Sequence, residues 1–258
     1  MCLITFSIQR ESDYPFVLVQ NREEQYSRPS QPLHRWPDFP HIYAGRDEEK
    51  GGTWLGFSRS GRFATLLNHP FTSFQADQEG QSRGFIPLNY LKDDSLSPAD
   101  YLDQLVQTRS SYDGYHALFG SWDELILYSN AIDETVTFSS GIHSVSNTLD
   151  DLSGFRKRRA SFLLEDYLFQ GPPRLDDLIE LFKDREKPPR MERFPEELSR
   201  EEAVEHGKVF ISGEEFGTVS STALIMDRSG HSQMKEVRYL PGGCEVGTSF
   251  VDFQTYKK

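Results

Sequence analysis

The sequence is poor in cysteine and in long hydrophobic runs. Its 258 residues include only two cysteines, Cys2 and Cys244, and no Cys-x-x-Cys pair. Neither a thiolate zinc site nor a disulfide framework is therefore expected. No stretch of eighteen apolar residues occurs, and the apolar run Leu3–Ile8 is too short for a signal peptide. We expect a cytoplasmic protein with no integral membrane segment.

Basic residues are also scarce. The chain carries 28 Lys and Arg against 40 Asp and Glu, which gives a net charge of −12. Because nucleic acids bind clustered basic side chains, we expect no nucleic-acid partner, although a local basic pocket stays compatible with this charge. No linker-like segment divides the chain, so residues 1–258 are interpreted as a single domain.

The order of the predicted elements indicates the fold class. Apolar runs bounded by turn residues predict strands, and helical periodicity predicts helices. The strands are 2–8, 16–20, 53–58, 62–68, 116–121, 124–128, 135–140, 220–226 and 233–239, and the helices are 97–110, 155–169 and 175–183. Since strands and helices are segregated along the chain, an α+β fold is predicted rather than a doubly wound sheet.

Some segments are expected to lack long regular elements. Residues 25–51 are rich in Pro, Ser and charge, and residues 69–84 are polar, so both are interpreted as surface loops. Residues 190–208 are charged, and a short helix is expected to start at Pro195. No strand or helix is predicted after Tyr239.

The second residue carries a strong chemical signal. Removal of Met1 would make Cys2 the N-terminus, so that one residue would hold both a thiol and a free α-amine. An α-amine titrates near ~8 and can act as a base at neutral pH. Such a residue is a complete catalytic unit, a nucleophile with its own base. Alternatively, Cys2 is a small apolar side chain in a buried strand.

Several short motifs together resemble a known family. They are Met1-Cys2, Asn21-Arg22-Glu23-Glu24, Tyr26-Ser27-Arg28-Pro29, Gly51-Gly52-Thr53-Trp54-Leu55-Gly56, Ala64-Thr65-Leu66-Leu67-Asn68, Ser129-Asn130, Ser146-Asn147 and Phe216-Gly217-Thr218. In this order and spacing they resemble the transport-and-Golgi-organisation family, also named NRDE after its Asn-Arg-Asp-Glu motif. The resemblance covers essentially the whole chain.

The resemblance implies a fold like that of N-terminal-nucleophile hydrolases. This fold is a four-layer αββα sandwich, in which two antiparallel sheets lie between helices. Cysteine-type amide hydrolases of this fold, such as bile-salt hydrolases and penicillin V acylases, are similar at the Met-Cys start and near Asn68. By this similarity Glu23 contacts the nucleophile, and Asn68 and Asn147 are candidate oxyanion donors. Asn68 at a strand end before Pro70 is otherwise ordinary turn chemistry.

Two departures from the family pattern count against catalysis. The motif's Asp is Glu23 here, one methylene longer, and a misplacement of about 1 Å can reduce a rate 10²-fold. The family often carries Gly-Thr-Arg before the penultimate strand, whereas Val219 follows Gly217-Thr218 in this chain. If that Arg serves the site in relatives, this chain has lost a cation there.

The candidate ligand-binding residues include Asn21, Arg22, Glu24, Thr53 and Trp54. The first three belong to the strand-end motif, in which Arg22, Glu23 and Glu24 can orient a nearby thiolate and shift its pKa, since a guanidinium lowers a thiol pKa and a carboxylate raises it. Thr53 and Trp54 can line a pocket, with the indole as a flat apolar wall. The alternatives are an exposed ion pair at a strand end and a core tryptophan.

His69 completes the candidate set, as a possible iron ligand for haem; the alternative is a solvated loop histidine. The other histidines show no metal-site spacing, and no catalytic metal is expected. The basic cluster Lys157-Arg158-Arg159, within the run Arg156–Arg159 at a helix start, either binds carboxylates of a ligand or forms a solvated helix face.

Three functions follow from these expectations. The resemblance implies first a carrier, because family members are associated with intracellular haem mobilisation and with lipid or acyl-CoA handling. Haem is then a cargo, and the ligand is small and hydrophobic or anionic. The second is a cysteine amide hydrolase that uses Cys2. The third is an interaction module of the secretory pathway, which no residue supports. The oligomeric state is left open.

Overall fold

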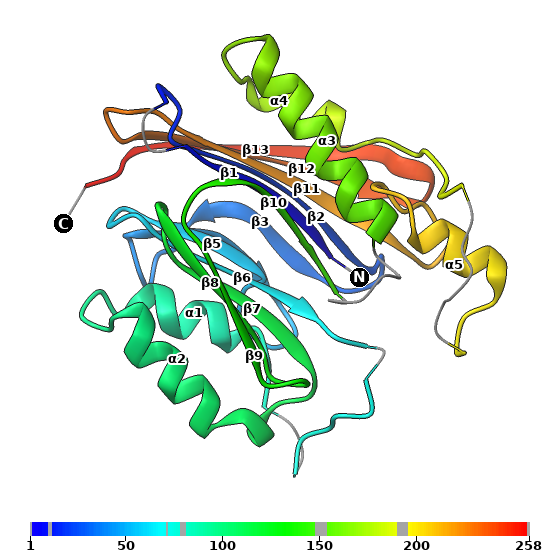
Figure 1. The fold of residues 1–258 in the computed structure, drawn as a ribbon, viewed down its shortest axis with the longest axis horizontal. Helices are drawn as coiled ribbons and strands as arrows, with labels where there is room; N and C mark the ends of the chain where they lie inside the picture. The colour runs from blue at the N-terminus through cyan, green and yellow to red at the C-terminus, as the bar shows by residue number, and fades with distance from the viewer. Residues whose placement is uncertain are drawn as a thin grey trace.

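Two antiparallel β-sheets lie face to face in the computed structural model, with helices on the outer side of each (Figure 1). The structure describes residues 2–9, 12–70, 72–77, 81–147, 154–189 and 196–256. One sheet contains, in spatial order, β10 (Gly141–Ser146), β1 (Leu3–Ile8), β2 (Phe16–Gln25), β11 (Phe216–Met226), β12 (His231–Leu240) and β13 (Cys244–Gln254).

In the second sheet, the strands lie side by side in the order in which they occur along the chain. It consists of β3 (Ser30–Arg35), β4 (Ile42–Asp47), β5 (Leu55–Ser58), β6 (Arg62–Asn68), β7 (Tyr115–Ser121), β8 (Glu124–Ser129) and β9 (Glu134–Phe138). The connection from β9 to β10 carries the chain from this sheet to the first one. Every described strand pair in both sheets is antiparallel.

The helices form the two outer layers. On the seven-stranded sheet lie α1 (Phe85–Lys92) and α2 (Pro98–Gln107), followed by a 3₁₀ turn, Arg109–Ser111. On the six-stranded sheet lie α3 (Gly154–Gln170) and α4 (Leu175–Leu181), and α5 (Arg200–His206) lies near one end of this sheet. A second 3₁₀ turn, Pro241–Gly243, connects β12 to β13. This arrangement confirms the predicted α+β sandwich.

Burial explains why the central strands are almost continuously apolar. All six residues of β1 are buried, because one face packs against the other sheet and the opposite face packs against α3. Phe6 and Phe16 belong to the core between the sheets, whereas Leu3 and Val17 pack toward the helices. The predicted start of α2 is also observed: Ser97 accepts a hydrogen bond from the Asp100 backbone N–H.

Several elements differ from the sequence-based predictions. The expected loop over 25–51 contains the strands β3 and β4, and the element α1 lies just after the expected loop over 69–84. Neither β10 nor β13 was predicted. In the charged segment the structure describes one short helix, α5, which begins at Arg200; the start expected at Pro195 lies outside the described residues. Among the described helices, none is both long and apolar enough to cross a membrane.

Candidate functional site

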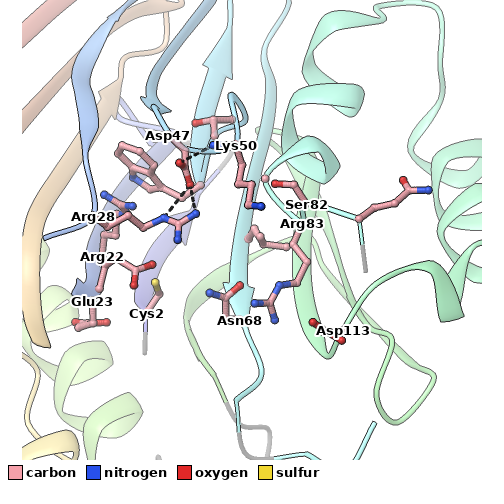
Figure 2. Close-up of a pocket in the computed structure, with 16 residues that line it drawn as sticks. Cys2, Arg22, Glu23, Arg28, Asp47, Lys50, Asn68, Ser82, Arg83 and Asp113 are labelled. Carbon is pink, nitrogen blue, oxygen red and sulfur yellow. Dashed lines mark hydrogen bonds and ion pairs between the residues drawn. The ribbon is translucent and has the colours of Figure 1, made fainter. Parts of the chain in front are cut away.

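A cavity of about 270 Å³ opens between the ends of the two sheets (Figure 2). Its walls combine charged side chains with few apolar ones. The lining residues are Cys2, Arg22, Glu23, Glu24, Arg28, Asp47, Lys50, Thr53, Trp54, Leu66, Asn68, Gln81, Ser82, Arg83, Gly84 and Asp113. Of the residues predicted from sequence, Cys2, Arg22, Glu23, Glu24, Thr53, Trp54 and Asn68 therefore share one cavity.

Strand ends bring these residues together. Cys2 immediately precedes β1, and the pairing of Leu3 with Asn21 places it beside Arg22 near the end of β2. From the other sheet, Asn68 ends β6, and Trp54 lies just before β5. Figure 2 shows Cys2 and Arg22 on one side of the cavity, with Asn68 on the other.

Cys2 is buried, with 8% of its surface exposed. Burial raises the pKa of its thiol, because the thiolate is poorly solvated there. The carboxylate of Glu23 raises this pKa further, and the guanidinium of Arg22 opposes both effects. The charged side chains of Glu23 and Arg22 thus shift the pKa of the thiol in opposite directions, and the backbone N–H of Glu23 acts in the same direction as Arg22.

Glu23 is linked to the helix layer rather than directed only at the thiol. Its Oε1 atom lies 2.5 Å from Nη2 of Arg156 in α3, and both side chains are almost fully buried. The Thr218 hydroxyl donates a weaker hydrogen bond to the same oxygen at 3.4 Å. Burial raises the pKa of Glu23 to about 7, although Arg156 favours the ionised form.

Arg22 is the most buried cation of the cavity, with 5% of its surface exposed. Its guanidinium stacks on the ring of Trp54, 3.9 Å from the centroid, and donates to the Ser30 hydroxyl at 3.2 Å. Burial lowers its pKa. Among the described residues, no carboxylate lies within ion-pair distance of Arg22. Trp54 is therefore both a wall of the cavity and a support for this cation.

Three further cations surround the cavity. Arg28 is held by an ion pair with Asp47 at 2.7 Å and another with Glu49 at 3.0 Å. Arg83 donates to the Gly114 carbonyl at 2.9 Å, has no ion pair with a described residue, and has a pKa lowered by burial. Lys50 is exposed at the rim. None of these cations was predicted from the sequence as a site residue, although Arg28 lies within a family motif.

One wall of the cavity depends on two glycines. The Thr53 N–H donates to the Gly84 carbonyl at 3.0 Å, which ties the turn after β4 to the segment that precedes α1. A Cβ atom on Gly52 would lie only 2.4 Å from the Gly84 carbonyl carbon. The absence of a side chain at Gly52 therefore permits this close approach.

Asn147 lies behind Asn68 and does not line the cavity. Its side-chain amide donates to the Asn68 backbone carbonyl, and the backbone carbonyl of Asn147 lies 2.9 Å from Nε2 of His116. In this arrangement the Asn147 amide supports the strand end that carries Asn68. The side chain of Asn68 itself is half-buried and reaches the cavity.

Asn21 and His69 lie outside the cavity lining. The Asn21 amide donates to the Phe182 and Val209 carbonyls, both at 2.9 Å, on the helix side of the sheet. The ring of His69 packs against His116 with their centroids 4.8 Å apart. In the described part of the chain, no group of three or more His, Cys, Asp or Glu side chains could hold a metal ion.

Comparison with known proteins confirms the resemblance found in the sequence. The family model for Transport and Golgi organisation 2 matches residues 1–241. The human Transport and Golgi organization protein 2 homolog is 26% identical over 258 aligned residues, with 92% of each chain covered. The Drosophila melanogaster Transport and Golgi organization protein 2 is 29% identical over 127 residues, which cover 45% of this chain and 44% of that one.

Solved structures agree with the fold. A conjugated bile acid hydrolase mutant from Clostridium perfringens has a TM-score of 0.55 and 12% identity, and covers 98% of this chain and 92% of its own. A Caenorhabditis elegans N-acylethanolamine-hydrolyzing acid amidase ortholog has a TM-score of 0.50 and 8% identity, with 87% and 92% covered. At such identities these structures establish an N-terminal-nucleophile hydrolase-like fold alone. The match of the family model over residues 1–241 shows that the chain belongs to the Transport and Golgi organisation 2 family.

Proposed function

We propose that the chain is a cytoplasmic carrier of an acyl-lipid, and that an anionic group of this ligand binds in the Cys2 cavity. The observation that carries the proposal is Arg22, a buried cation with no ion pair among the described residues. A buried charge is costly unless it is paired. An anionic ligand would supply the missing partner, through the bidentate contacts that guanidinium groups make with carboxylates and phosphates.

The other cations strengthen this preference for an anion. Arg83 lines the cavity without an ion pair to a described residue, and Lys50 lies at the rim. Trp54 and Leu66 are the large apolar side chains of the lining. They offer contact for the first part of an acyl chain, while the remainder would extend toward solvent.

Haem is the alternative cargo of this proposal. Its propionates suit the same cations, but the mainly polar lining offers little surface for the macrocycle, and His69 lies outside the lining. The geometry therefore favours the acyl-lipid. A haemin titration tests the alternative: a Soret shift that disappears in His69→Ala would support haem ligation by this residue.

Binding of palmitate and palmitoyl-CoA, measured by calorimetry, tests the proposal. We expect Arg22→Gln to weaken binding by roughly 10-fold or more, as for the loss of a charge-assisted hydrogen bond. Arg174→Gln is the matched control, because the Arg174 side chain is 76% exposed and lies outside the cavity lining. Equal binding by both variants, or no binding of either probe by the unmodified protein, would refute the proposal.

A second candidate function is amide hydrolysis by Cys2. It is supported by the position of Cys2 opposite Asn68 and by the bile acid hydrolase of similar fold, whose solved form is a C2A mutant. Cys2 would attack the amide carbonyl carbon, and its free amine would pass the thiol proton to the leaving amine as the C–N bond breaks. Water would then hydrolyse the thioester. Asn68 would stabilise the oxyanion, whereas the predicted second donor, Asn147, lies outside the cavity and is bonded to the Asn68 carbonyl. This chemistry requires removal of Met1.

Intact mass and turnover separate the two functions. If Met1 is retained, the amine needed as a base is absent. Protein lacking Met1 is incubated with a panel of N-acyl amides, and we expect weak or absent turnover because Glu23 replaces the family's Asp. Turnover that Cys2→Ala abolishes and Glu23→Asp enhances would instead make the protein an enzyme.

A further inference from the structure

A line of phenylalanines follows the solvent side of α3. Phe155, Phe162 and Phe169 are spaced by seven residues, and their exposure rises toward the C-terminal end of the helix. Phe155 is partly exposed, Phe162 is 57% exposed and Phe169 is 93% exposed. Because seven residues return to nearly the same side of an α-helix, with a drift of about 20°, these side chains form one stripe.

This stripe is not part of the core of the fold. The opposite side of α3 carries Ala160 and Leu164, both fully buried against the six-stranded sheet. In Figure 1, α3 lies on the outer side of this sheet. The three side chains lie about two helical turns apart, with charged residues on the turns between them. They offer apolar contacts to another protein in a row rather than as one continuous patch.

Charged residues flank the stripe in a complementary order. On one side lie Arg158 and, seven residues later, Glu165; on the other side lie Arg159 and Asp166. The basic member thus comes first on each side, in the N-terminal half of the helix. Arg158 and Glu165 are exposed and form no ion pair with a described residue, whereas Arg159 already pairs with Asp184.

We propose that α3 binds α3 of a second copy of this chain, antiparallel and about a two-fold axis through Phe162. The two Phe162 rings then meet at the axis, and Phe155 of each copy contacts Phe169 of the other. The same symmetry places Arg158 of each copy beside Glu165 of the other. In such an isologous interface each contact between different residues occurs twice. The α3 pair therefore provides the phenylalanine contacts and two ion pairs between Arg158 and Glu165.

The size of this surface predicts the strength of the dimer. A helix of 17 residues is about 26 Å long, and one helix pair buries less than the roughly 1,200–2,000 Å² of a standard stable interface. The dimer is therefore weak and depends on concentration. Sedimentation velocity from ~10 to ~200 μM should show a shift from monomer to dimer, which corresponds to an affinity in the micromolar range.

A substitution in the stripe tests the apolar seam. Phe162→Asp should abolish the dimer over this concentration range, because it places two carboxylates at the axis. Phe250→Asp on β13 is the matched control, since Phe250 is 54% exposed and lies on a different element. It should dimerise like the unmodified protein. Far-ultraviolet circular dichroism confirms that both variants fold.

A charge exchange tests the antiparallel arrangement. Arg158→Glu alone and Glu165→Arg alone each place like charges beside one another twice, and each should weaken self-association roughly 10-fold at low salt. In an equimolar mixture of these two variants, a heterodimer regains both opposite-charge pairs. Dimer should therefore reappear in the mixture at concentrations where either variant alone is monomeric.

Three results would each overturn the proposal. One is a monomer at every concentration tested. Another is a dimer that Phe162→Asp leaves intact, which would locate self-association on another surface. The last is a mixture of Arg158→Glu and Glu165→Arg that stays monomeric, which would exclude the antiparallel pairing.

Discussion

Glu23 and Arg156 form an ion pair 2.5 Å apart that is almost completely buried between β2 and α3. Glu23 also lines the cavity that contains Cys2. The pair therefore connects the helix layer directly to the residues around the thiol. Its partner Arg156 is the first residue of the basic run Arg156–Arg159 near the start of α3. From the sequence this run was expected to bind carboxylates of a ligand or to form a solvated helix face, and nothing in it indicated a pairing with Glu23.

Removing one member of this pair should be strongly destabilising. Arg156→Gln leaves the Glu23 carboxylate buried without its main partner, and the loss of one member of a buried pair costs about 3–5 kcal/mol. The free energy of unfolding from urea titrations measures this loss. The double variant Glu23→Gln with Arg156→Gln should be more stable than Arg156→Gln alone. If the single variant is within about 1 kcal/mol of the unmodified protein, the pair does not stabilise the fold.

The pH dependence of stability should carry the signature of Glu23. Burial raises its pKa to about 7 from an ordinary value of 4.5. Between these two pH values the folded state binds more protons than the unfolded state, so this group's contribution to the free energy of unfolding falls as pH rises. The full effect is at most roughly 3 kcal/mol.

Two histidines, the buried His116 and the half-buried His206, change stability with pH in the opposite direction, and their effect must be separated from that of Glu23. Burial lowers the pKa of His116 to about 3 and that of His206 to about 4. Their neutral forms are therefore favoured in the folded state, and their contribution to the free energy of unfolding is lost as pH falls below about 6.5. Comparison with Glu23→Gln isolates the carboxyl. Between pH 5 and pH 8 the unmodified protein should lose stability relative to this variant, and parallel curves would contradict the assignment.

From the sequence, the central strands of the two sheets were easier to predict than the edge strands β3 and β13. The central strands are recognisable because both faces are buried, which makes their sequences continuously apolar. The edge strand β3 contains Pro32, which normally argues against a strand but is tolerated at a sheet edge. An edge strand of the other sheet, β13, is largely exposed and mixes polar residues with Val246 and Phe250. Neither resembles a buried strand in its pattern.

The site was predictable only in part, for reasons of geometry. Family motifs at strand ends indicated Cys2 and Asn68, since strand ends meet at the edge of a sandwich. The cations Lys50 and Arg83 come from turns and loops, whose positions depend on tertiary contacts such as that between Thr53 and Gly84. Local sequence carries no signal for such contacts.

The reactivity of Cys2 should respond in opposite directions to its two charged neighbours. Burial and the carboxylate of Glu23 raise the thiol pKa, whereas the backbone hydrogen bond from Glu23 and the guanidinium of Arg22 lower it. Because the thiolate is the reactive form, Glu23→Gln should accelerate alkylation by iodoacetamide at pH 7.5, and Arg22→Gln should slow it. Changes of roughly 3- to 10-fold correspond to about half a pKa unit to one unit.

Measurement of this effect needs a background without the exposed thiol of Cys244. The Cys244→Ser variant provides it, and mass spectrometry then reports modification of Cys2 alone. Rates are compared in folded protein, with circular dichroism as the check. The same direction of change in both variants would show that opening of the structure, not charge, controls the thiol.

The wall of the cavity should be sensitive to a single methyl group on Gly52. In Gly52→Ala the new Cβ atom would lie 2.4 Å from the carbonyl carbon and 2.5 Å from the carbonyl oxygen of Gly84. These are backbone atoms, so the two segments must separate, which weakens the hydrogen bond from Thr53 to Gly84. Overpacking of this kind costs about 1–3 kcal/mol, and we expect palmitoyl-CoA binding to weaken because the wall that carries Arg83 moves outward.

Gly84→Ala is the matched control for this prediction, because it adds a methyl group to the other side of the same contact. Its Cβ atom would lie 3.3 Å from the nearest atom, the Cα atom of Gly52, a distance that small shifts relieve. Thermal unfolding and calorimetric binding of the two variants are compared with the unmodified protein. Gly52→Ala should lose clearly more stability and affinity than Gly84→Ala, because its Cβ atom would lie 2.4 Å rather than 3.3 Å from the nearest backbone atom. Equal losses in both variants would mean that the close approach does not determine the shape of the cavity.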